Sequence, residues 1–339
     1  MKLLGAAPFT LFVWAAAGTL VGCGGSGAYQ APSAQSRYSY DVRTSSIRLV
    51  LPPSARRAPE RSWMAPDAKQ NDLLYISSEM TWDVDVYTYP QGRRAGVITD
   101  DPPGFQIPSG LCSDPKGDVF VTNEGYDNIL EYAHAGSSPI ATLSDPNEAP
   151  VACSFDPTSG TLAVANVDSS FGGGSISLYT NASGTPEIFS DSAIGLVYFC
   201  GFDDKGNLFV DGFTTLPSQG GVFQFAELPK GSSSFTNITL NRRVNVPGAV
   251  QWDGTYVAVG DVKTGVIYRT NGAGGKVEST TRLVGTNYDF QPWIQGKTIV
   301  VPSNRSIETG FWHYPVGGKA HKTIKIGSPY GATVSVAGK

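Results

Sequence analysis

The feature that most constrains the fold of this chain is a unit that returns six times after residue 70. Each unit has short apolar runs separated by turn signals, and its third run carries an aromatic residue just before a turn. These aromatics are 43, 47, 46, 43 and 46 residues apart: Tyr89, Tyr132, Tyr179, Phe225, Tyr268 and Tyr314. A unit of four short strands at this spacing is typical of a propeller blade, so six aromatics predict six blades.

The connections inside the units indicate tight antiparallel hairpins. The link between the first two runs reads DPKGD, DPTSG and DDKGN in three successive units. Asp and Pro open such turns and Gly supplies a positive φ. The runs between them are rich in Val, Ile, Thr, Tyr and Phe, and no window keeps an amphipathic helical period for three turns. We therefore expect an all-β domain.

The two ends of the repeat region complement each other. The first unit, at LLYISSEMTWDVDVYTYP, lacks a first strand, while the tail SPYGATVSVAGK is a first strand with nothing after it. We expect Ala332–Ala337 to complete the N-terminal blade, because closing the ring in this way leaves no unpaired sheet edge. The prediction is a six-bladed β-propeller of four-stranded blades over residues 71–339. The alternative is a β-sandwich or a stack of sheets.

Residues 1–22 have the organisation of a secretory signal: Lys2, an apolar stretch and a small-residue exit. The end of this segment, Leu20-Val21-Gly22-Cys23, resembles the lipobox of bacterial lipoproteins. That resemblance implies cleavage before Cys23, lipidation of its thiol and anchoring to a membrane. It places the chain in a bacterial cell envelope, outside the cytoplasm, in the periplasm or outer membrane or on the cell surface. The alternative is an ordinary signal peptide with a chance cysteine.

Residues 23–70 are rich in Ser, Ala, Pro and Arg without a sustained period, and we interpret them as a mostly disordered tether. Residues 24–70 contain seven basic and three acidic side chains, whereas residues 71–339 contain 17 basic and 26 acidic ones. A domain with this acidic excess is not expected to bind nucleic acid, whose phosphates need a basic surface. We expect a monomer that contacts the membrane through its N-terminal lipid.

The run DVFVTNEGYDNILEY resembles the repeat of the YVTN and NHL group of propellers, in which an apolar strand ends in Thr-Asn or Ala-Asn before a polar turn. TLAVANVDSS and NLFVDGF are similar to it more loosely. The resemblance implies a propeller, and members of that group include extracytoplasmic binding proteins, surface proteins and some metal-dependent lactonases. One fold hosting many functions is the usual case.

Polar residues follow the second run of five units and are the candidate ligand-binding residues: Asn123, Asn166, Asp211, Asp261 and Asn304. The resemblance to lactonase-like propellers implies that such residues hold a divalent cation, often calcium, at one mouth of the channel, and oxygen ligands suit such an ion. The alternative is that Asn and Asp make local turns where a strand ends. Only two of the five are acids, so no metal site is assigned to them and calcium stays a possible cofactor.

The three cysteines after Cys23 lie in the first strands of three consecutive units: Cys112, Cys153 and Cys200. A disulfide needs Cα atoms within about 7 Å, and we expect equivalent positions on adjacent blades to lie farther apart. The prediction is three buried free thiols, with a reactive cysteine cluster as the alternative. Trp252 and Trp293, also on first strands, are expected to pack between blades.

No catalytic residues are assigned. The sequence contains no G-x-S-x-G nucleophile motif, and its three histidines do not form a zinc-binding motif. The interpretation is a non-enzymatic module that binds a small molecule, a glycan or a protein on one propeller face. The alternatives are a metal-dependent lactonase or esterase-type hydrolase with a cation at the channel mouth, and a structural protein of the cell envelope.

Overall fold

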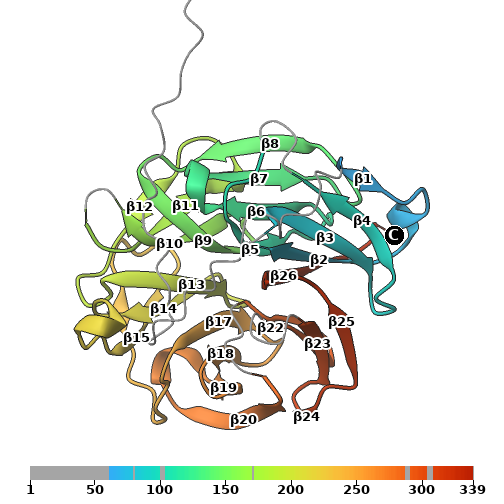
Figure 1. Cartoon of the computed structure of the whole chain (residues 1–339). Coiled ribbons are helices and arrows are strands. Elements are labelled where there is room, and N and C mark those ends of the chain that lie inside the picture. The colour runs from blue at the N-terminus through green and yellow to red at the C-terminus, as the bar shows by residue number, and fades with distance from the viewer. Residues whose placement is uncertain are drawn as a thin grey trace, which may run out of the picture. The chain divides into compact units, whose positions relative to one another are not determined.

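The computed structural model describes residues 61–78, 81–99, 104–169, 172–286, 291–303 and 308–338. Within this part of the chain, six antiparallel sheets of at least four strands form the blades of a β-propeller (Figure 1). No helix among the described residues is long and apolar enough to span a membrane. The helical segments that are described are short 3-10 turns: η2 (Ala68–Gln70), η3 (Glu124–Tyr126), η4 (Thr180–Ala182), η5 (Pro217–Gln219) and η6 (Gly272–Gly274).

The strands of each blade run in order from the inner to the outer edge. Blade 1 contains β26 (Pro329–Ser335), β2 (Leu73–Ser78), β3 (Asp83–Thr88) and β4 (Arg94–Ile98). Blade 2 contains β5 (Pro108–Ser113), β6 (Val119–Asn123), β7 (Asn128–Tyr132) and β8 (Pro139–Ser144). Blade 3 contains β9 (Glu148–Phe155), β10 (Leu162–Ser169), β11 (Ser175–Tyr179) and β12 (Glu187–Phe189).

The second half of the ring repeats this order. Blade 4 contains β13 (Leu196–Phe202), β14 (Leu208–Phe213), β15 (Phe223–Leu228) and β16 (Thr236–Asn237). Blade 5 contains β17 (Pro247–Trp252), β18 (Val257–Asp261), β19 (Val266–Thr270) and β20 (Val277–Val284), with β24 (Gly318–Lys319) parallel to β20 at its outer edge. Blade 6 contains β21 (Trp293–Gln295), β22 (Thr298–Ser303), β23 (Glu308–His313) and β25 (Lys322–Lys325).

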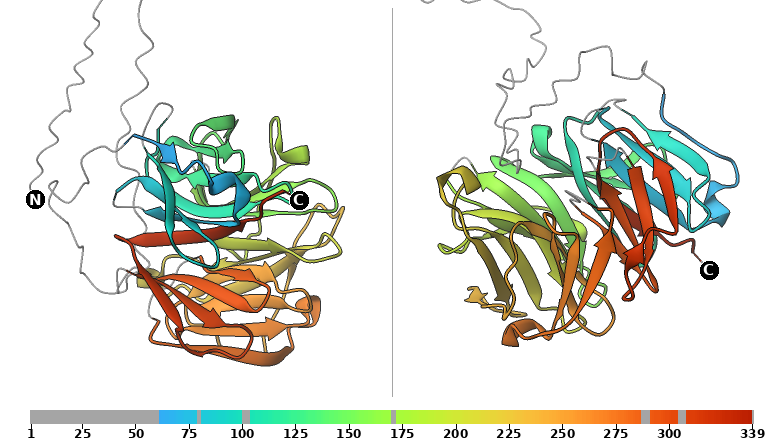
Figure 2. Two further views of the ribbon diagram at one scale, coloured as in Figure 1. Left: turned by 90° about the vertical axis from the view of Figure 1, so that its right-hand side faces the viewer. Right: turned by 60° about the horizontal axis from the view of Figure 1, so that its bottom comes forward.

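The predicted closure of the ring is confirmed. β26 pairs antiparallel with β2, and Val334 lies opposite Leu74 (Figure 2). Both side chains are buried, in a cluster that also contains Val300 and Phe311 of blade 6. The last strand is thus held by a sheet on one side and by the neighbouring blade on the other, and this burial stabilises the closed ring.

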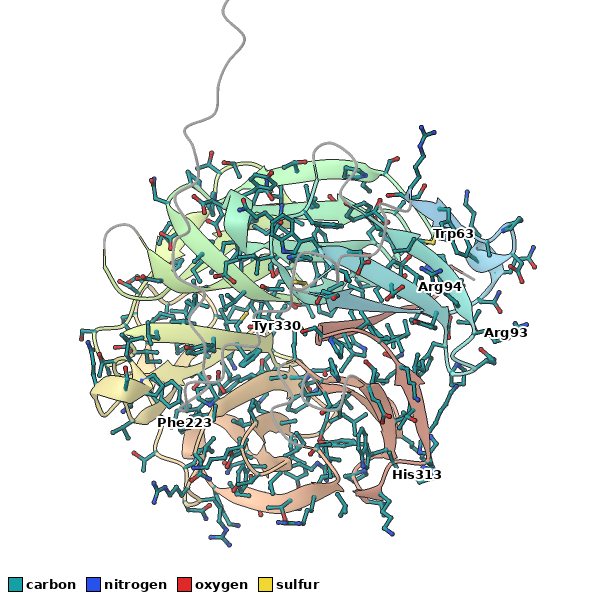
Figure 3. All side chains as sticks on the ribbon, in the orientation of Figure 1. Trp63, Arg93, Arg94, Phe223, His313 and Tyr330 are labelled. Atoms are coloured by element: carbon teal, nitrogen blue, oxygen red, sulfur yellow. A yellow bond between two sulfur atoms is a disulfide. The ribbon has the colours of Figure 1, made fainter. Side chains whose placement is uncertain are left out.

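Secondary structure is described within the last ten residues of the range predicted as a tether, residues 23–70. β1 (Trp63–Met64) pairs with β4 as a fifth, outermost strand of blade 1. The Arg94 guanidinium lies 5.5 Å from the centre of the Trp63 ring, and the two side chains lie together in Figure 3. A two-residue strand has no recognisable period in the sequence, so the sequence pattern does not reveal β1. Cys23 and the rest of residues 1–60 lie outside the described residues.

The prediction of three free thiols is wrong for two of them. Cys112 and Cys153 form a disulfide with their Cα atoms 5.6 Å apart, whereas Cys200 is a buried free thiol as expected. The inner strands of blades 2 and 3 approach closely at Gly110, where a Cβ atom would come within 2.7 Å of the Cα of Ala152. Because glycine leaves this space open, the two backbones come within disulfide reach.

Candidate ligand-binding groove between blades 4 and 5

The described candidate residues lie where expected, at or near the end of the second strand of their blades, and all four are buried: Asn123, Asn166, Asp211 and Asp261. Asn304 lies outside the described residues. The hydrogen bonds of the four decide whether their polar atoms are available to a ligand. Three of the four accept hydrogen bonds from backbone N–H groups in the first strands of blades or in the segments just before them.

Asn123 and Asp261 hold the incoming chain of their own blades. The Oδ1 atom of Asn123 accepts a hydrogen bond of 2.7 Å from the backbone N–H of Gln106. The carboxylate of Asp261 accepts hydrogen bonds from the backbone N–H groups of Asn245, Val246 and Lys263 at 3.1 to 3.3 Å. These contacts are those of turn and linker residues, so the turn interpretation accounts for both side chains.

Asp211 links two blades. Its Oδ1 atom accepts a hydrogen bond from the Phe199 N–H of its own blade, and its Oδ2 atom accepts one from the Gly248 N–H of blade 5, both at 3.2 Å. Burial raises the pKa of Asp211 well above its ordinary value, although the two backbone donors lower it. Its polar atoms are therefore used by the interface between blades 4 and 5.

Asn166 differs from the other three. Its Nδ2 group donates to the hydroxyls of Ser175 and Ser177 at 3.1 and 2.9 Å, but its buried Oδ1 atom has no hydrogen-bond partner. No hydrogen bond joins any of the four candidate residues to another, so the ring of ligands implied by their strand positions is not assembled by direct contacts among the described residues.

A cavity of about 520 Å³ lies elsewhere, between blades 4 and 5. Three segments contribute the polar and aromatic side chains that line it: the turn between β13 and β14, the strand β15 and the turn between β17 and β18. Phe209 and Val257 are buried beneath these segments, and η6 adds Asn271, Gly272 and Ala273. We call this cavity the interblade groove.

The turn of blade 4 is held rigidly by one side chain. Asp203 Oδ1 accepts hydrogen bonds from the backbone N–H groups of Lys205 and Asn207 at 2.9 and 2.8 Å. Its Oδ2 atom accepts one from the Asn207 side-chain amide at 2.9 Å. Asp203 is therefore a structural residue of the turn, and it leaves the exposed Asp204 and Lys205 at the rim of the groove.

Glu227 is the acid inside the groove. It lies opposite Phe209 in the sheet of blade 4 and is 7% exposed. Burial raises the pKa of Glu227, the nearby Asp203 charge raises it further, and Lys205 lowers it. None of the described residues donates a hydrogen bond to this carboxylate. The groove therefore contains a largely buried acidic residue, and Lys205 is the nearby cation that favours its ionised form.

The opposite wall is aromatic. Trp252 ends the first strand of blade 5 and is partly buried against the core, and Tyr256 follows in the next turn. The guanidinium of Arg269 lies 4.8 Å from the centre of the Tyr256 ring, and it forms an ion pair of 2.5 Å with Asp253. This ion pair supports the Tyr256 ring from behind, so the aromatic wall is pre-organised.

The sequence contains only indirect signals for this groove. The DDKGN run was interpreted as a turn, which it is, and Trp252 as packing between blades, which describes its buried part. The same turn occurs in blade 2 as DPKGD. The repeat pattern therefore does not show which interface between blades contains a groove. At the interface between blades 2 and 3, for example, the ring of Phe155 stacks on Phe120 with centroids 5.9 Å apart.

Among the described residues, no group of three or more His, Cys, Asp or Glu side chains is arranged to hold a metal ion. No known family model matches this sequence, and no curated protein matches it. Solved structures do match in fold. A chain of the crystal structure of a nidogen/laminin complex superposes with a TM-score of 0.64 at 13% sequence identity, covering 79% of this chain and 99% of that one. This likeness shows the propeller fold alone.

Proposed function

We propose that this chain is a non-enzymatic binding module of the bacterial cell envelope, held by a lipid on Cys23 and a tether, whose interblade groove binds a basic side chain of a protein partner. The observation that carries the proposal is that Glu227, which is 7% exposed, lines the same groove as the rings of Trp252 and Tyr256. An ammonium or guanidinium group would pair with the acid and lie against the aromatic rings.

The charge of the domain is unequal in its two halves. Residues 71–191 contain 17 acidic and three basic side chains, whereas residues 192–339, which include the groove, contain nine acidic and 14 basic ones. The acidic half would attract a basic protein to the ring over a distance set by the ionic strength, and within the groove the attraction depends on its own acidic side chains. The chain of similar fold named above belongs to a complex of two proteins. That likeness is one of fold, and it supports only the view that a propeller of this form can take part in a protein complex.

The proposal is tested by fluorescence anisotropy with a labelled peptide of alternating lysine and glycine, at low and moderate salt, added to the full chain. We expect Glu227→Gln to weaken binding about tenfold, the equivalent of about 1.4 kcal/mol, because the variant keeps the shape of the side chain but removes its charge. Acetylation of the peptide lysines should abolish binding, since it removes the cation.

Glu131→Gln is the matched control. Glu131 lies opposite Phe120 in blade 2, as Glu227 lies opposite Phe209 in blade 4, and its pKa is also raised by burial. It does not line the groove. Equal weakening by the two variants would show that the acidic surface, and not the groove, binds the peptide. Binding of a neutral hexasaccharide with no binding of the lysine peptide would show that the proposed ligand class is wrong.

A further inference from the structure

Blade 3 departs from the other blades where its second strand ends. β9 and β10 are each eight residues long, and their pairing is irregular on both sides of Asn166, which lies opposite Pro150, while Ser169 lies opposite Glu148. The equivalent strand β6 of blade 2 ends at Asn123 without such an extension. A single shift of register between the first and second strands also occurs beside Asn123, Asp211 and Asp261, so the second shift, between Asn166 and Ser169, is what distinguishes blade 3. Irregular pairing redirects side chains and is common next to functional sites.

A chain of hydrogen bonds runs through the residues at this extension. The Ser177 hydroxyl donates to Asp145 Oδ1 at 2.7 Å, and the Ser175 hydroxyl donates to Glu148 Oε2 at 2.6 Å. The two protons of Asn166 Nδ2 go to the same two hydroxyl oxygens. Every donor of these five side chains is thereby used, and each hydroxyl has one hydrogen to give.

Two buried oxygen atoms are left without a donor. Asp145 Oδ2 and Asn166 Oδ1 belong to side chains that are 0% exposed, and neither has a hydrogen-bond partner. The Oδ1 atom of Asn123, at the same strand end in blade 2, accepts a backbone hydrogen bond from Gln106. A buried oxygen without a donor is costly, so its presence in one blade and not in the next indicates a bound group that is not part of the described chain.

Within the part of the chain that the structure describes, no Lys or Arg side chain forms a hydrogen bond or an ion pair with Asp145, Glu148 or Asn166. Between residues 104 and 191 the only Lys or Arg is Lys116, in the turn after β5. The charges that act on the pair come from other acids: Asp127 on Asp145, and Asp127 and Asp168 on Glu148. The cluster is therefore a concentration of acidic side chains.

We infer that Asp145, Glu148 and Asn166 form a site for one hard divalent cation of the calcium class, with their carboxylate and amide oxygens as ligands. Calcium accepts carboxylate and neutral amide oxygens together and tolerates irregular geometry, and it has no need of nitrogen or sulfur ligands. All three residues belong to blade 3 and the segment that leads into it. The site is therefore separate from the interblade groove, and it would fix the connection between blades 2 and 3.

The test uses the full chain, freed of metal by EDTA and then of EDTA, with CaCl₂ alone as the probe. Equilibrium dialysis should give one bound calcium ion per chain. The midpoint of thermal unfolding should rise by about 5 °C when calcium is well above its dissociation constant. Asp145→Asn and Glu148→Gln should lose the calcium-dependent rise, each measured against its own metal-free midpoint, because each removes a ligand charge.

Asp261→Asn is the control, since Asp261 lies at the strand end of blade 5 that corresponds to Asn166 and already accepts backbone hydrogen bonds. It should keep the full calcium-dependent rise. No bound calcium at millimolar concentration would overturn the inference. So would an undiminished rise in both Asp145→Asn and Glu148→Gln, which would place any bound ion elsewhere.

Discussion

Cys112 and Cys153 are joined by a disulfide between the innermost strands of two adjacent blades, with their Cα atoms 5.6 Å apart. The bond closes a loop of 41 residues that contains most of blade 2. A propeller is stabilised chiefly by contacts between neighbouring sheets. The disulfide therefore joins two inner strands that are also packed against each other in the folded protein. In the unfolded chain it keeps the same two segments together.

Replacing both cysteines with alanine is expected to lower the free energy of unfolding by about 4 kcal/mol, from the entropy of a loop of this length. The measurement is urea unfolding of the oxidised protein and of the variant. Cys200→Ala is the control, because Cys200 is a buried free thiol on the first strand of blade 4. Cys200→Ala should lower the free energy of unfolding much less than the loss of the disulfide does. An equal decrease would mean that the disulfide contributes nothing beyond the packing of the cysteine side chains.

A second link between blades is made by one glutamine. Gln291 accepts a hydrogen bond of 2.8 Å from the Leu111 N–H and donates one of 3.0 Å to the Leu111 carbonyl, while its own backbone pairs with Tyr330 and Ala332. Its side chain thus pairs with β5 as a neighbouring strand would. It joins the segment before blade 6 to the inner strands of blades 1 and 2.

Gln291→Ala is expected to cost about 1–3 kcal/mol of unfolding free energy, because it leaves two backbone groups of Leu111 unpaired. Gln291→Glu should cost at least as much, since a carboxylate cannot donate to the Leu111 carbonyl. The check is urea unfolding at pH 8, with Gln224→Ala on the partly exposed face of β15 as the control. A harmless Gln291→Glu would show that the donated hydrogen bond contributes nothing.

The regular features of the fold could be predicted from the sequence because each depends on local chemistry repeated in register. Tyr132, Tyr179 and Phe225 mark third strands as expected, and Val334 lies opposite Leu74 because the unpaired strands at the two ends complement each other. The disulfide could not be predicted in the same way. It depends on how closely two inner strands approach, and that distance is set by contacts between residues far apart in the sequence.

The candidate functional residues also fall into those that could be predicted from the sequence and those that could not. The strand-end positions of Asn123 and Asp261 were predictable, and their hydrogen bonds to incoming backbone account for the choice of residue. The groove around Glu227 was not, since its walls come from turns of two blades whose sequences resemble those of other blades. The oxygen of Asn166 that lacks a donor could not be predicted either, because the equivalent position in blade 2 is also an asparagine, Asn123.

His134 should contribute to the pH dependence of the free energy of unfolding. It lies where β26 contacts blade 2. Ser335 donates its hydroxyl proton to the Gly117 carbonyl at 2.5 Å, so the Nδ1 atom of His134, 2.6 Å from the Ser335 oxygen, is the donor to it. The Nε2 atom of His134 is buried and has no hydrogen-bond partner. Burial lowers the pKa of His134, although the Asn71 backbone and the charges of Asp72 and Asp118 act in the opposite direction.

Because the folded pKa of His134 lies below its unfolded value of about 6.5, the unfolded state binds more protons as the pH falls below that value. The contribution of His134 is present at pH 7.5 and is lost as the pH falls toward its folded pKa. His134→Phe should therefore lose less stability than the wild type between pH 7.5 and 5.5. Gln224→Ala, on the partly exposed face of β15, removes no titratable group and should follow the wild type. Parallel curves for wild type and His134→Phe would contradict this role.

The ion pair between Arg269 and Asp253 allows an effect on the stability of the domain to be separated from an effect on peptide binding. Asp253 Oδ2 accepts hydrogen bonds from Arg269 Nε at 2.5 Å and from the Tyr314 hydroxyl at 2.6 Å. Burial alone would raise the pKa of Asp253, but these hydrogen bonds hold it below its ordinary value. The Asp253 side chain is 0% exposed. Removing Arg269 would therefore leave a buried carboxylate without a cation.

Arg269→Ala is expected to cost about 3–5 kcal/mol of unfolding free energy and to weaken peptide binding, since the Tyr256 ring loses its support. Tyr314→Phe is the matched variant: it removes one hydrogen bond from the same carboxylate, should cost about 1–2 kcal/mol, and leaves the groove lining intact. Urea unfolding and peptide anisotropy on both proteins separate the two effects. If Tyr314→Phe weakened binding as much as Arg269→Ala, the loss would reflect general destabilisation of blades 5 and 6 and not the orientation of Tyr256.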